Sequence, residues 1–309
     1  MVEFHITTTN LMIVGVVQGK VKMFGKKDQE VQALKRTAIV YDYDGTLAKG
    51  NIQENSFFPS IQLETGQFWK MVKQTTREQD ADEILVYMQL MISEAAKQGV
   101  TVSKESLLNH GRNSPLFDGL KDGSWFDRIN KFAGEIGLSL EHYIVSSGTQ
   151  EMIEGSPIAK QFKTIFASKY MFDDEGNAVW PSLAINYTTK TQFLFRINKG
   201  VDNVWDNAGV NKFMPQEERP IPFPRMIFIG DGDTDIPAMK MTTFNGGHSI
   251  ATYDPSRDPR SLNKIHGLIA DGRADFVAPA NYRNASQMDI LIKGILGRIA
   301  RGEGYRPSQ

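Results

Sequence analysis

Hydrophobic and polar positions along the chain form two alternating patterns. Short apolar runs of strand length occur at residues 37–41, 142–145, 163–167, 225–229, 249–253 and 275–278. Between several of these runs, apolar residues recur every three or four positions, which is the period of an amphipathic helix. Strands that alternate with helices are typical of α/β proteins. The pattern therefore predicts an α/β fold with a doubly wound, mostly parallel sheet.

Further elements follow from the same pattern and from its turn signals. Residues 170–180 form a predicted hairpin, because an acidic, glycine-bearing stretch at 173–177 separates two apolar flanks. The proline-rich stretch 200–224 is polar, and we interpret it as a long surface loop. Helices are predicted at residues 124–137, 150–161, 190–197 and 288–299.

Residues 51–115 differ from the rest of the chain, because they have few strand-like runs and much helical periodicity. Phe68 and Val72 share one helical face, and Ser103 is a residue type that caps the start of a helix. A helical insert between two α/β segments indicates a cap. We expect a smaller α-helical cap at 51–115, an α/β core at 36–50 and 116–309, and an N-terminal accessory segment at 1–35 with one or two strands and a short polar helix.

Composition and charge narrow the class of protein. The 309 residues carry a formal net charge of −1, which gives no reason to expect nucleic acid or an anionic membrane as a partner. The absence of cysteine excludes disulfides, thiolate metal sites and cysteine nucleophiles. The apolar run Leu11–Val17 follows no basic segment and is too short to span a bilayer. We expect a cytoplasmic protein with no nucleic-acid or membrane partner, and the sequence indicates no particular oligomeric state.

Polar clusters directly follow three of the predicted strands. Asp42 and Asp44 follow the first strand, Ser146 follows a second, and the stretch GDGDTD at 230–235 follows a third. Parallel strands bring their carboxyl ends to one edge of the sheet, where open α/β folds bind their ligands. We therefore expect the three clusters to converge there.

The residue types in these clusters indicate phosphoryl chemistry. Several aspartates together need a counter-charge, and Mg²⁺ is the first choice because its ligands are oxygens. The hydroxyl of Ser146 and the ammonium of Lys190 suit the remaining oxygens of a phosphorylated substrate. Asp42 could then act as a nucleophile that forms an aspartyl-phosphate, with Asp44 as the acid and base.

Two of these assignments have competitors. Ser147 could serve in place of Ser146, and either serine could instead cap the helix that follows. Lys199 competes with Lys190, but it lies at the C-terminal end of the predicted helix, where the macrodipole favours a cation. Lys199 therefore has a structural explanation that Lys190 lacks, and we favour Lys190.

Taken together, these positions resemble the four motifs of the haloacid dehalogenase (HAD) superfamily. The motifs occur in the usual order over residues 37–50 and 140–280. The first, DxDx[TV], stands here as Asp42-Tyr43-Asp44-Gly45-Thr46; the second is similar to YIVSSG with Ser146, the third to TTKTQFLF with Lys190, and the fourth to GDGDTD with Asp231 and Asp235.

The resemblance implies a role for each of these aspartates. Asp42 would be the nucleophile and a metal ligand, and Asp44 would be the acid and base and would bind the metal through its backbone carbonyl. Asp231 would be the third protein ligand, and Asp235 a carboxylate close to the metal. The second aspartate of the first motif is typical of the phosphatases and phosphomutases of the superfamily. The insert between the first and second motifs resembles the cap of the phosphoserine phosphatase-like branch.

The sequence thus leads to a functional hypothesis. We expect a Mg²⁺-dependent phosphomonoester hydrolase that acts on a small phosphorylated metabolite through an aspartyl-phosphate on Asp42. The alternatives are a phosphotransferase or phosphomutase with the same intermediate, and a non-catalytic metal-binding partner protein on the same fold. Substrate selectivity is expected from the cap, where Phe57, Phe58, Phe68 and Trp69 are candidates to face either the site or the cap's own core.

Overall fold

The computed structural model describes residues 13–17, 20–24, 34–256 and 267–302. The chain divides into two units, residues 1–34 and 35–309. In the first unit, strands β1 (Ile13–Val17) and β2 (Lys20–Phe24) pair in antiparallel fashion. The strands expected in the N-terminal segment are therefore present, whereas the short polar helix expected after them falls outside the described residues.

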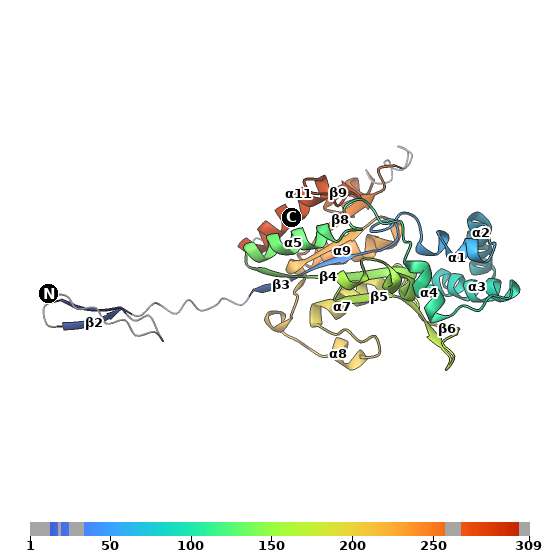
Figure 1. Cartoon of the computed structure of the whole chain (residues 1–309), viewed down its shortest axis with the longest axis horizontal. Helices are drawn as coiled ribbons and strands as arrows, with labels where there is room; N and C mark the ends of the chain where they lie inside the picture. The colour runs from blue at the N-terminus through green and yellow to red at the C-terminus, as the bar shows by residue number, and fades with distance from the viewer. Residues whose placement is uncertain (1–12, 18–19, 25–33, 257–266, 303–309) are drawn as a thin grey trace. The chain divides into compact units, whose positions relative to one another are not determined.

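The second unit is built around a seven-stranded sheet, shown in Figure 1. Its strand order is β6-β5-β4-β3-β7-β8-β9. Every neighbouring pair is parallel except β5 and β6, which form the expected antiparallel hairpin. The strands are β3 (Lys35–Tyr41), β4 (Leu138–Thr149), β5 (Thr164–Phe172), β6 (Ala178–Leu183), β7 (Met226–Gly230), β8 (His248–Tyr253) and β9 (Phe276–Pro279).

Strand β3 lies at the centre of the sheet and contributes side chains to two hydrophobic cores. Ile39 and Tyr41 belong to one core, and Ala38 and Val40 belong to the other. Successive side chains of a strand point to opposite faces of the sheet, so both faces must be covered. A continuous apolar run is what such a doubly covered strand requires.

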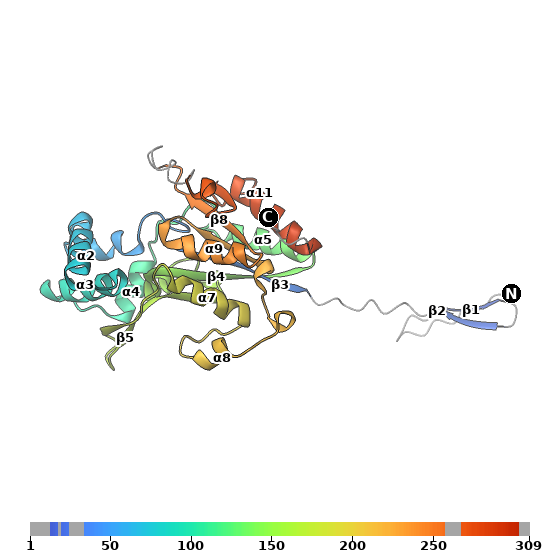
Figure 2. The ribbon, with the colours of Figure 1, turned by 180° about the vertical axis from the view of Figure 1, so that it is seen from behind.

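Helices cover both faces, which confirms the predicted doubly wound α/β fold. Helices α5 (Ser124–Glu135) and α11 (Gln287–Arg301) pack on the face of Ile39 and Tyr41. Helices α7 (Thr189–Lys199) and α9 (Ile236–Phe244) pack on the face of Ala38 and Val40 and can be followed in Figure 2.

The segment 51–115 is helical, as expected, and lies at one end of the sheet (blue to teal in Figure 1). Ser103 caps its last helix, as the sequence predicted. Its buried side chains, among them Phe58 and Met88, join the same hydrophobic core as Ile39. The segment consists of η1 (Ile52–Glu54), α1 (Phe57–Ser60), α2 (Thr65–Gln79), α3 (Glu83–Lys97) and α4 (Lys104–Gly111).

Two expectations need correction. The helix expected at 150–161 is shorter: α6 covers only Gln150–Gly155, and a 3₁₀ turn, η2, follows at Ala159–Gln161. The cause is Pro157, because a residue before proline avoids the helical region, and Ser156 is extended with φ −67° and ψ 152°.

The stretch 200–224 is not simply a surface loop. It contains α8 (Asn207–Asn211) and η3 (Gln216–Glu218), and η4 (Phe223–Arg225) follows at its end. Ile221 and Phe223 are buried in the core on the α7 face. The buried guanidinium of Arg196 donates hydrogen bonds to the carbonyl oxygens of Asn203 and Val204, which holds the start of the stretch against α7.

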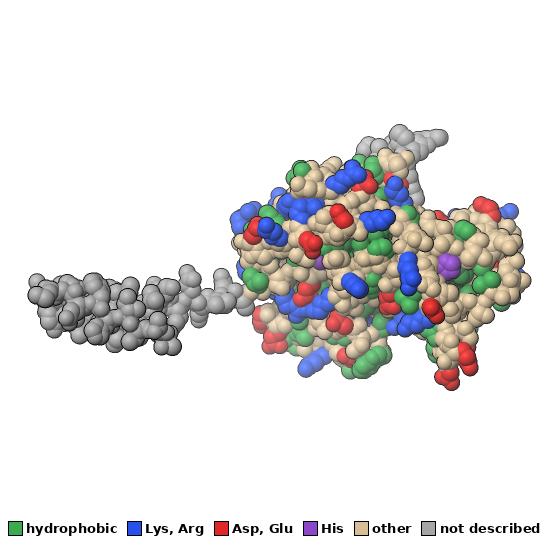
Figure 3. All heavy atoms as spheres, in the orientation of Figure 1, with side chains coloured by type: hydrophobic (Ala, Val, Ile, Leu, Met, Phe, Trp, Pro, Cys, Tyr) green, Lys and Arg blue, Asp and Glu red, His purple; other side chains and the backbone are tan. Residues whose placement is uncertain are grey.

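The surface of the second unit mixes both charge signs. On the face shown in Figure 3, acidic and basic side chains are interspersed. Among the helices of the described residues, none combines the length and apolar character needed to cross a membrane.

A chain of polar side chains links the buried Trp125, Tyr41 and His142 to the exposed Asn130. The indole N–H of Trp125 donates to the Tyr41 hydroxyl at 3.1 Å, and that hydroxyl lies 3.1 Å from Nδ1 of His142. The other ring nitrogen of His142 lies 3.0 Å from Oδ1 of Asn130. Every bond is satisfied if the neutral imidazole carries its proton on Nε2, because Nδ1 can then accept from Tyr41.

This arrangement predicts that His142 makes the protein sensitive to acid. Burial lowers the pKa of His142 from 6.5 to about 3. As pH falls below 6.5, His142 binds a proton in the unfolded chain but stays neutral in the folded protein. The free energy of unfolding therefore falls by about 1.4 kcal/mol per pH unit from this group alone. We expect His142→Gln to lose less unfolding free energy than wild type between pH 7 and pH 4.5, measured by urea denaturation. Equal losses in the two proteins would contradict the prediction.

Candidate active site

The three polar clusters expected from the sequence meet at one edge of the sheet. Strands β4, β3 and β7 are neighbours and run parallel, so their carboxyl ends lie together. Asp42 follows β3, Ser146 lies in the last part of β4, and Asp231 follows β7. All three line one cavity of about 460 Å³, which falls in the range of small-molecule sites.

The loop after β3 has a conformation that requires its glycine. Gly45 has a φ of +71°, which side-chain-bearing residues rarely adopt. A Cβ atom at this position would also lie 2.0 Å from Oδ2 of Asp231. The glycine thus lets the turn bring the first motif against the loop after β7.

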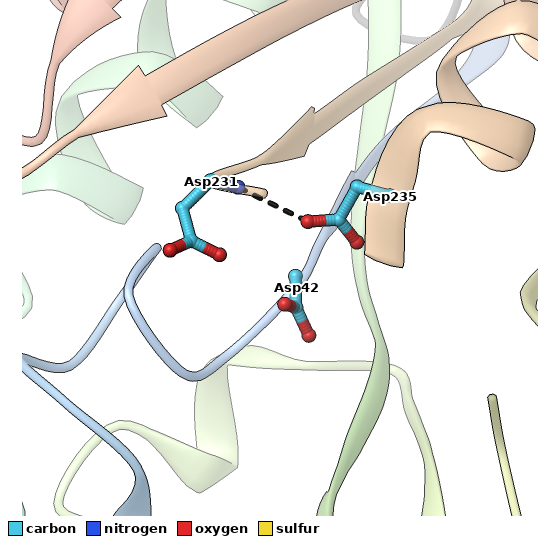
Figure 4. Close-up of side chains that lie close together, drawn as sticks. All are labelled: Asp42, Asp231 and Asp235. Carbon is cyan, nitrogen blue, oxygen red and sulfur yellow. Dashed lines mark hydrogen bonds between the residues drawn. The ribbon is translucent and has the colours of Figure 1, made fainter. Parts of the chain in front are cut away.

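Three carboxylates lie close together at this point, as Figure 4 shows. Asp42, Asp231 and Asp235 each offer an oxygen, and these oxygens all lie within 4.8 Å of one another. Asp42 is 4% exposed and Asp235 is fully buried. Carboxylates this close repel one another, and they offer a metal ion only oxygen ligands. The set therefore fits a hard divalent cation such as Mg²⁺.

Asp44 adds a fourth carboxylate and connects the site to the helical segment. Its Oδ1 accepts a hydrogen bond from the backbone N–H of Ile52 at 2.8 Å. Removal from water, together with the neighbouring Asp42 carboxylate, raises the pKa of Asp44 well above its ordinary range. Asp44 also lines the cavity, so its carboxyl group is accessible to a molecule bound there.

Lys190 contacts two of the carboxylates, Asp42 and Asp235, on the buried side of the site. Its ammonium is fully buried and lies 2.6 Å from Oδ1 of Asp235 and 3.1 Å from Oδ1 of Asp42. Burial alone would lower the pKa of Lys190, but the two carboxylates outweigh it and the pKa is raised. Lys190 therefore stays positively charged.

Asp235 binds Lys190 and also holds the backbone of the loop after β7. Its second oxygen accepts hydrogen bonds from the backbone N–H groups of Asp231 at 3.1 Å and Gly232 at 3.2 Å. Both of its oxygens thus have partners within the protein. Asp235 can be buried next to the other carboxylates because each of its oxygens has a hydrogen-bond donor.

Lys199, the competitor of Lys190, has a different environment. Its ammonium donates to the carbonyl oxygens of Val210 at 2.6 Å and Lys212 at 2.7 Å. It thus holds the stretch after α7, at the end of the helix away from Lys190. The structure brings Lys190 to the carboxylates and leaves Lys199 outside them.

Both candidate serines reach the cavity. The hydroxyl of Ser146 is buried and accepts a hydrogen bond from the N–H of Gly148 at 3.1 Å. The hydroxyl of Ser147 is buried without a hydrogen-bond partner among the described residues, and its carbonyl accepts from Tyr87. The pairing of β4 with β5 is irregular between Ser146 and Thr149, and this irregularity lets consecutive residues face the site.

The helical segment also contributes to the cavity, and the structure decides which of its aromatic candidates face the site. Trp69 lines it, whereas Phe57, Phe58 and Phe68 are buried in the core. Glu83 and Tyr87 were missed, although residues four apart share a helix face and could have been found together. Further lining residues from outside the motifs are Asn51, Gln53, Glu54, Ile84 and Tyr187.

Comparisons with known proteins begin with sequence. No protein-family model matches the chain. An uncharacterized protein of Borreliella burgdorferi is 27% identical over 282 residues, which cover 81% of this chain and 93% of that protein.

Solved structures of low sequence identity are similar in fold. A probable phosphoserine phosphatase from Vibrio cholerae in its unliganded form is 13% identical with a TM-score of 0.52, over 88% of this chain and 68% of that one. A HAD family hydrolase from Salmonella enterica serovar Typhi is 15% identical with a TM-score of 0.51, over 85% and 72%. A substrate-bound phosphoserine phosphatase is 16% identical with a TM-score of 0.50, over 83% and 97%.

These likenesses extend over 83–88% of this chain. The residues that carry the motifs lie together at the carboxyl edge of the sheet, where the resemblance in sequence required them. The chain therefore has the fold of the HAD family hydrolases, in the form found in phosphoserine phosphatases.

Proposed function

We propose that the protein is a Mg²⁺-dependent phosphomonoester hydrolase that acts on a small phosphorylated metabolite. The observation that carries the proposal is the position of Asp42, whose carboxylate lines the cavity and lies 3.1 Å from the buried ammonium of Lys190. A nucleophilic carboxylate beside a fixed cation is what attack on a phosphoryl group requires. The HAD fold of the neighbours supports the same class of reaction.

In the proposed mechanism, Asp42 and Asp44 share the chemistry. A carboxylate oxygen of Asp42 forms a bond to phosphorus as the ester oxygen leaves, and Asp44 gives that oxygen its proton. Asp44 then takes a proton from a water molecule, whose oxygen attacks the aspartyl-phosphate and releases inorganic phosphate. Asp42 is regenerated as a carboxylate, so the cycle consumes one water for each ester.

Neighbouring residues hold the phosphoryl oxygens and the metal. The Ser146 hydroxyl, which lines the cavity, binds a phosphoryl oxygen. The buried Lys190 ammonium, positioned by its 2.6 Å contact with Asp235, supplies positive charge directly behind Asp42. The carboxylates of Asp42 and Asp231 and the backbone carbonyl of Asp44 would hold Mg²⁺, with the Asp235 carboxylate close to the ion. The bound ion would supply positive charge that offsets the negative charge on the phosphoryl oxygens.

We also propose that residues 51–115 act as a cap over the core of residues 36–50 and 116–309. Ile52 binds the Asp44 carboxylate, and Tyr87 binds the backbone of Ser147 at 2.7 Å. The segment therefore contacts the residues assigned to chemistry and lines the space beyond them. This position suits a segment that selects the substrate.

Replacing the nucleophile tests the mechanism directly. We expect Asp42→Asn to lower kcat for an aryl phosphate by at least about 10⁴-fold, because an amide cannot form the intermediate. Phosphate release is measured with Mg²⁺, and Asp174→Asn at the tip of the β5–β6 hairpin serves as the matched control. Wild-type rates in Asp42→Asn would refute the mechanism. Release only in the presence of an acceptor alcohol would indicate a phosphotransferase instead.

The two lysines of α7 allow a second test. Lys190→Met should lower kcat by about 10²–10³-fold, because a fixed positive charge behind Asp42 is lost. Lys199→Met should retain the wild-type rate and lower only the melting temperature, since it loses the contacts to Val210 and Lys212. Similar losses of kcat in both variants, with similar melting temperatures, would argue against the assigned role of Lys190.

Metal binding has a readout that does not depend on turnover. A ligand that binds only the folded state raises the melting temperature, so Mg²⁺ should stabilise the wild-type protein and EDTA should reverse the effect. Asp231→Asn removes one carboxylate from the group within 4.8 Å and should require a higher Mg²⁺ concentration for the same shift. An unchanged Mg²⁺ dependence in this variant would exclude Asp231 as a ligand.

A further inference from the structure

The cavity extends beyond the residues assigned to chemistry, and its remaining lining has a particular character. We name five of these residues the headgroup wall: Glu54, Trp69, Glu83, Tyr87 and Tyr187. They supply two carboxylates and three aromatic rings. A substrate whose phosphate reached Asp42 would place its alcohol portion in this part of the cavity.

The charge of the lining restricts that alcohol portion. Of the described residues that line the cavity, none is Lys, Arg or His, whereas Glu54 and Glu83 are both acidic. A carboxylate or second phosphate on the substrate would therefore find repulsion and no partner. The lining favours a headgroup that is cationic.

Glu83 is the carboxylate available to such a headgroup. It is half-buried at the first turn of α3 and makes no hydrogen bond or ion pair within the described part of the chain. Glu54, in contrast, accepts from the indole N–H of Trp69 at 2.7 Å and from the side chain of Asn51 at 2.6 Å. Glu54 thus holds the wall in place while Glu83 remains open to a ligand.

Two aromatic rings of the wall, those of Trp69 and Tyr87, pack against each other. The ring of Trp69 packs edge-on against Tyr87, with centroids 5.9 Å apart, and against Phe68 at 5.3 Å. Because Trp69 and Tyr87 touch each other, a flat base cannot insert between them. Aromatic faces beside a carboxylate are instead the environment that binds ammonium groups.

We propose that the substrate is the phosphomonoester of an amino alcohol, with its ammonium group bound by Glu83 against the aromatic rings of the headgroup wall. This inference rests on the proposed function and names the substrate class of that site. Hydrolysis consumes one water, breaks the bond between phosphorus and the ester oxygen, and releases the protonated amino alcohol and inorganic phosphate. A phosphorylated amino acid is disfavoured, because its carboxylate meets no cation in the lining.

The test compares substrates of the same shape that differ in charge. The kcat/KM of wild type is measured for phosphocholine and for its isostere with a neutral headgroup, 3,3-dimethylbutyl phosphate, with phosphoethanolamine, phosphoserine and a nucleoside 5′-monophosphate alongside. We expect phosphocholine to be preferred over this isostere about tenfold or more, the size of a partly desolvated cation–π and charge contact. Phosphoserine should fall below phosphoethanolamine.

A variant pair locates the effect. Glu83→Gln should reduce the ratio of kcat/KM for phosphocholine over its isostere about tenfold. Glu105→Gln is the matched control, because Glu105 occupies the first turn of α4, is exposed and does not line the cavity. Its ratio should equal that of wild type, and equal ratios in all three proteins would overturn the assignment to Glu83.

The outcomes separate this inference from the proposed function. Phosphate release from an aryl phosphate without preference for phosphocholine over its isostere would overturn the substrate class and leave the hydrolase standing. A preference for the nucleoside monophosphate or for phosphoserine would do the same. No Mg²⁺-dependent release from any substrate would remove the proposed function and the inference with it. If Glu83→Gln does not fold, the comparison of isosteres in wild type still decides.

Discussion

The candidate site depends on the buried ion pairs of the Lys190 ammonium with Asp42 and Asp235. The ammonium connects α7, the loop after β3 and the loop after β7, because its partners are Asp42 and Asp235. A buried charge without a partner is destabilising by several kcal/mol, so each member of this group requires the others. The same contacts bring together the carboxylate, the cation and the two loops on which the proposed phosphoryl chemistry depends. The stability of this edge of the sheet and its chemistry are therefore linked.

The helical segment 51–115 contacts the candidate site directly and packs against the sheet. The N–H of Ile52 binds Asp44, and its helices share a hydrophobic core with the sheet. At the base of the segment, α4 and α6 approach through Gly111 and Gly155, where a Cβ would lie 1.8 and 1.9 Å from backbone oxygen of the other helix. Contact this close gives the segment a defined position beside the cavity, which its proposed role in substrate selection requires.

Most of the fold could be predicted because local patterns and tertiary packing agree. The run at 38–41 is apolar at every position, as a strand covered on both faces requires, and the structure has β3 at the centre of the sheet. The failures have local causes too. Pro157 ends α6 earlier than its apolar pattern predicted. Ile221 and Phe223 are core residues, but they stand in a stretch whose polar and proline-rich composition favoured a surface loop.

The sequence by itself determined the order of the elements, the convergence of Asp42, Ser146 and Asp231, and the chemical types available there. Parallel strands fix which ends meet, so residue order was sufficient for these conclusions. The sequence favoured Lys190 over Lys199 through the helix macrodipole, and the tertiary structure then showed which lysine lies beside the carboxylates, since both belong to one helix and differ in what surrounds them. Only the tertiary structure decided that Glu83 and Tyr87 face the cavity. A helix pattern shows which residues share a face, but the packing of that helix against the sheet decides what the face meets.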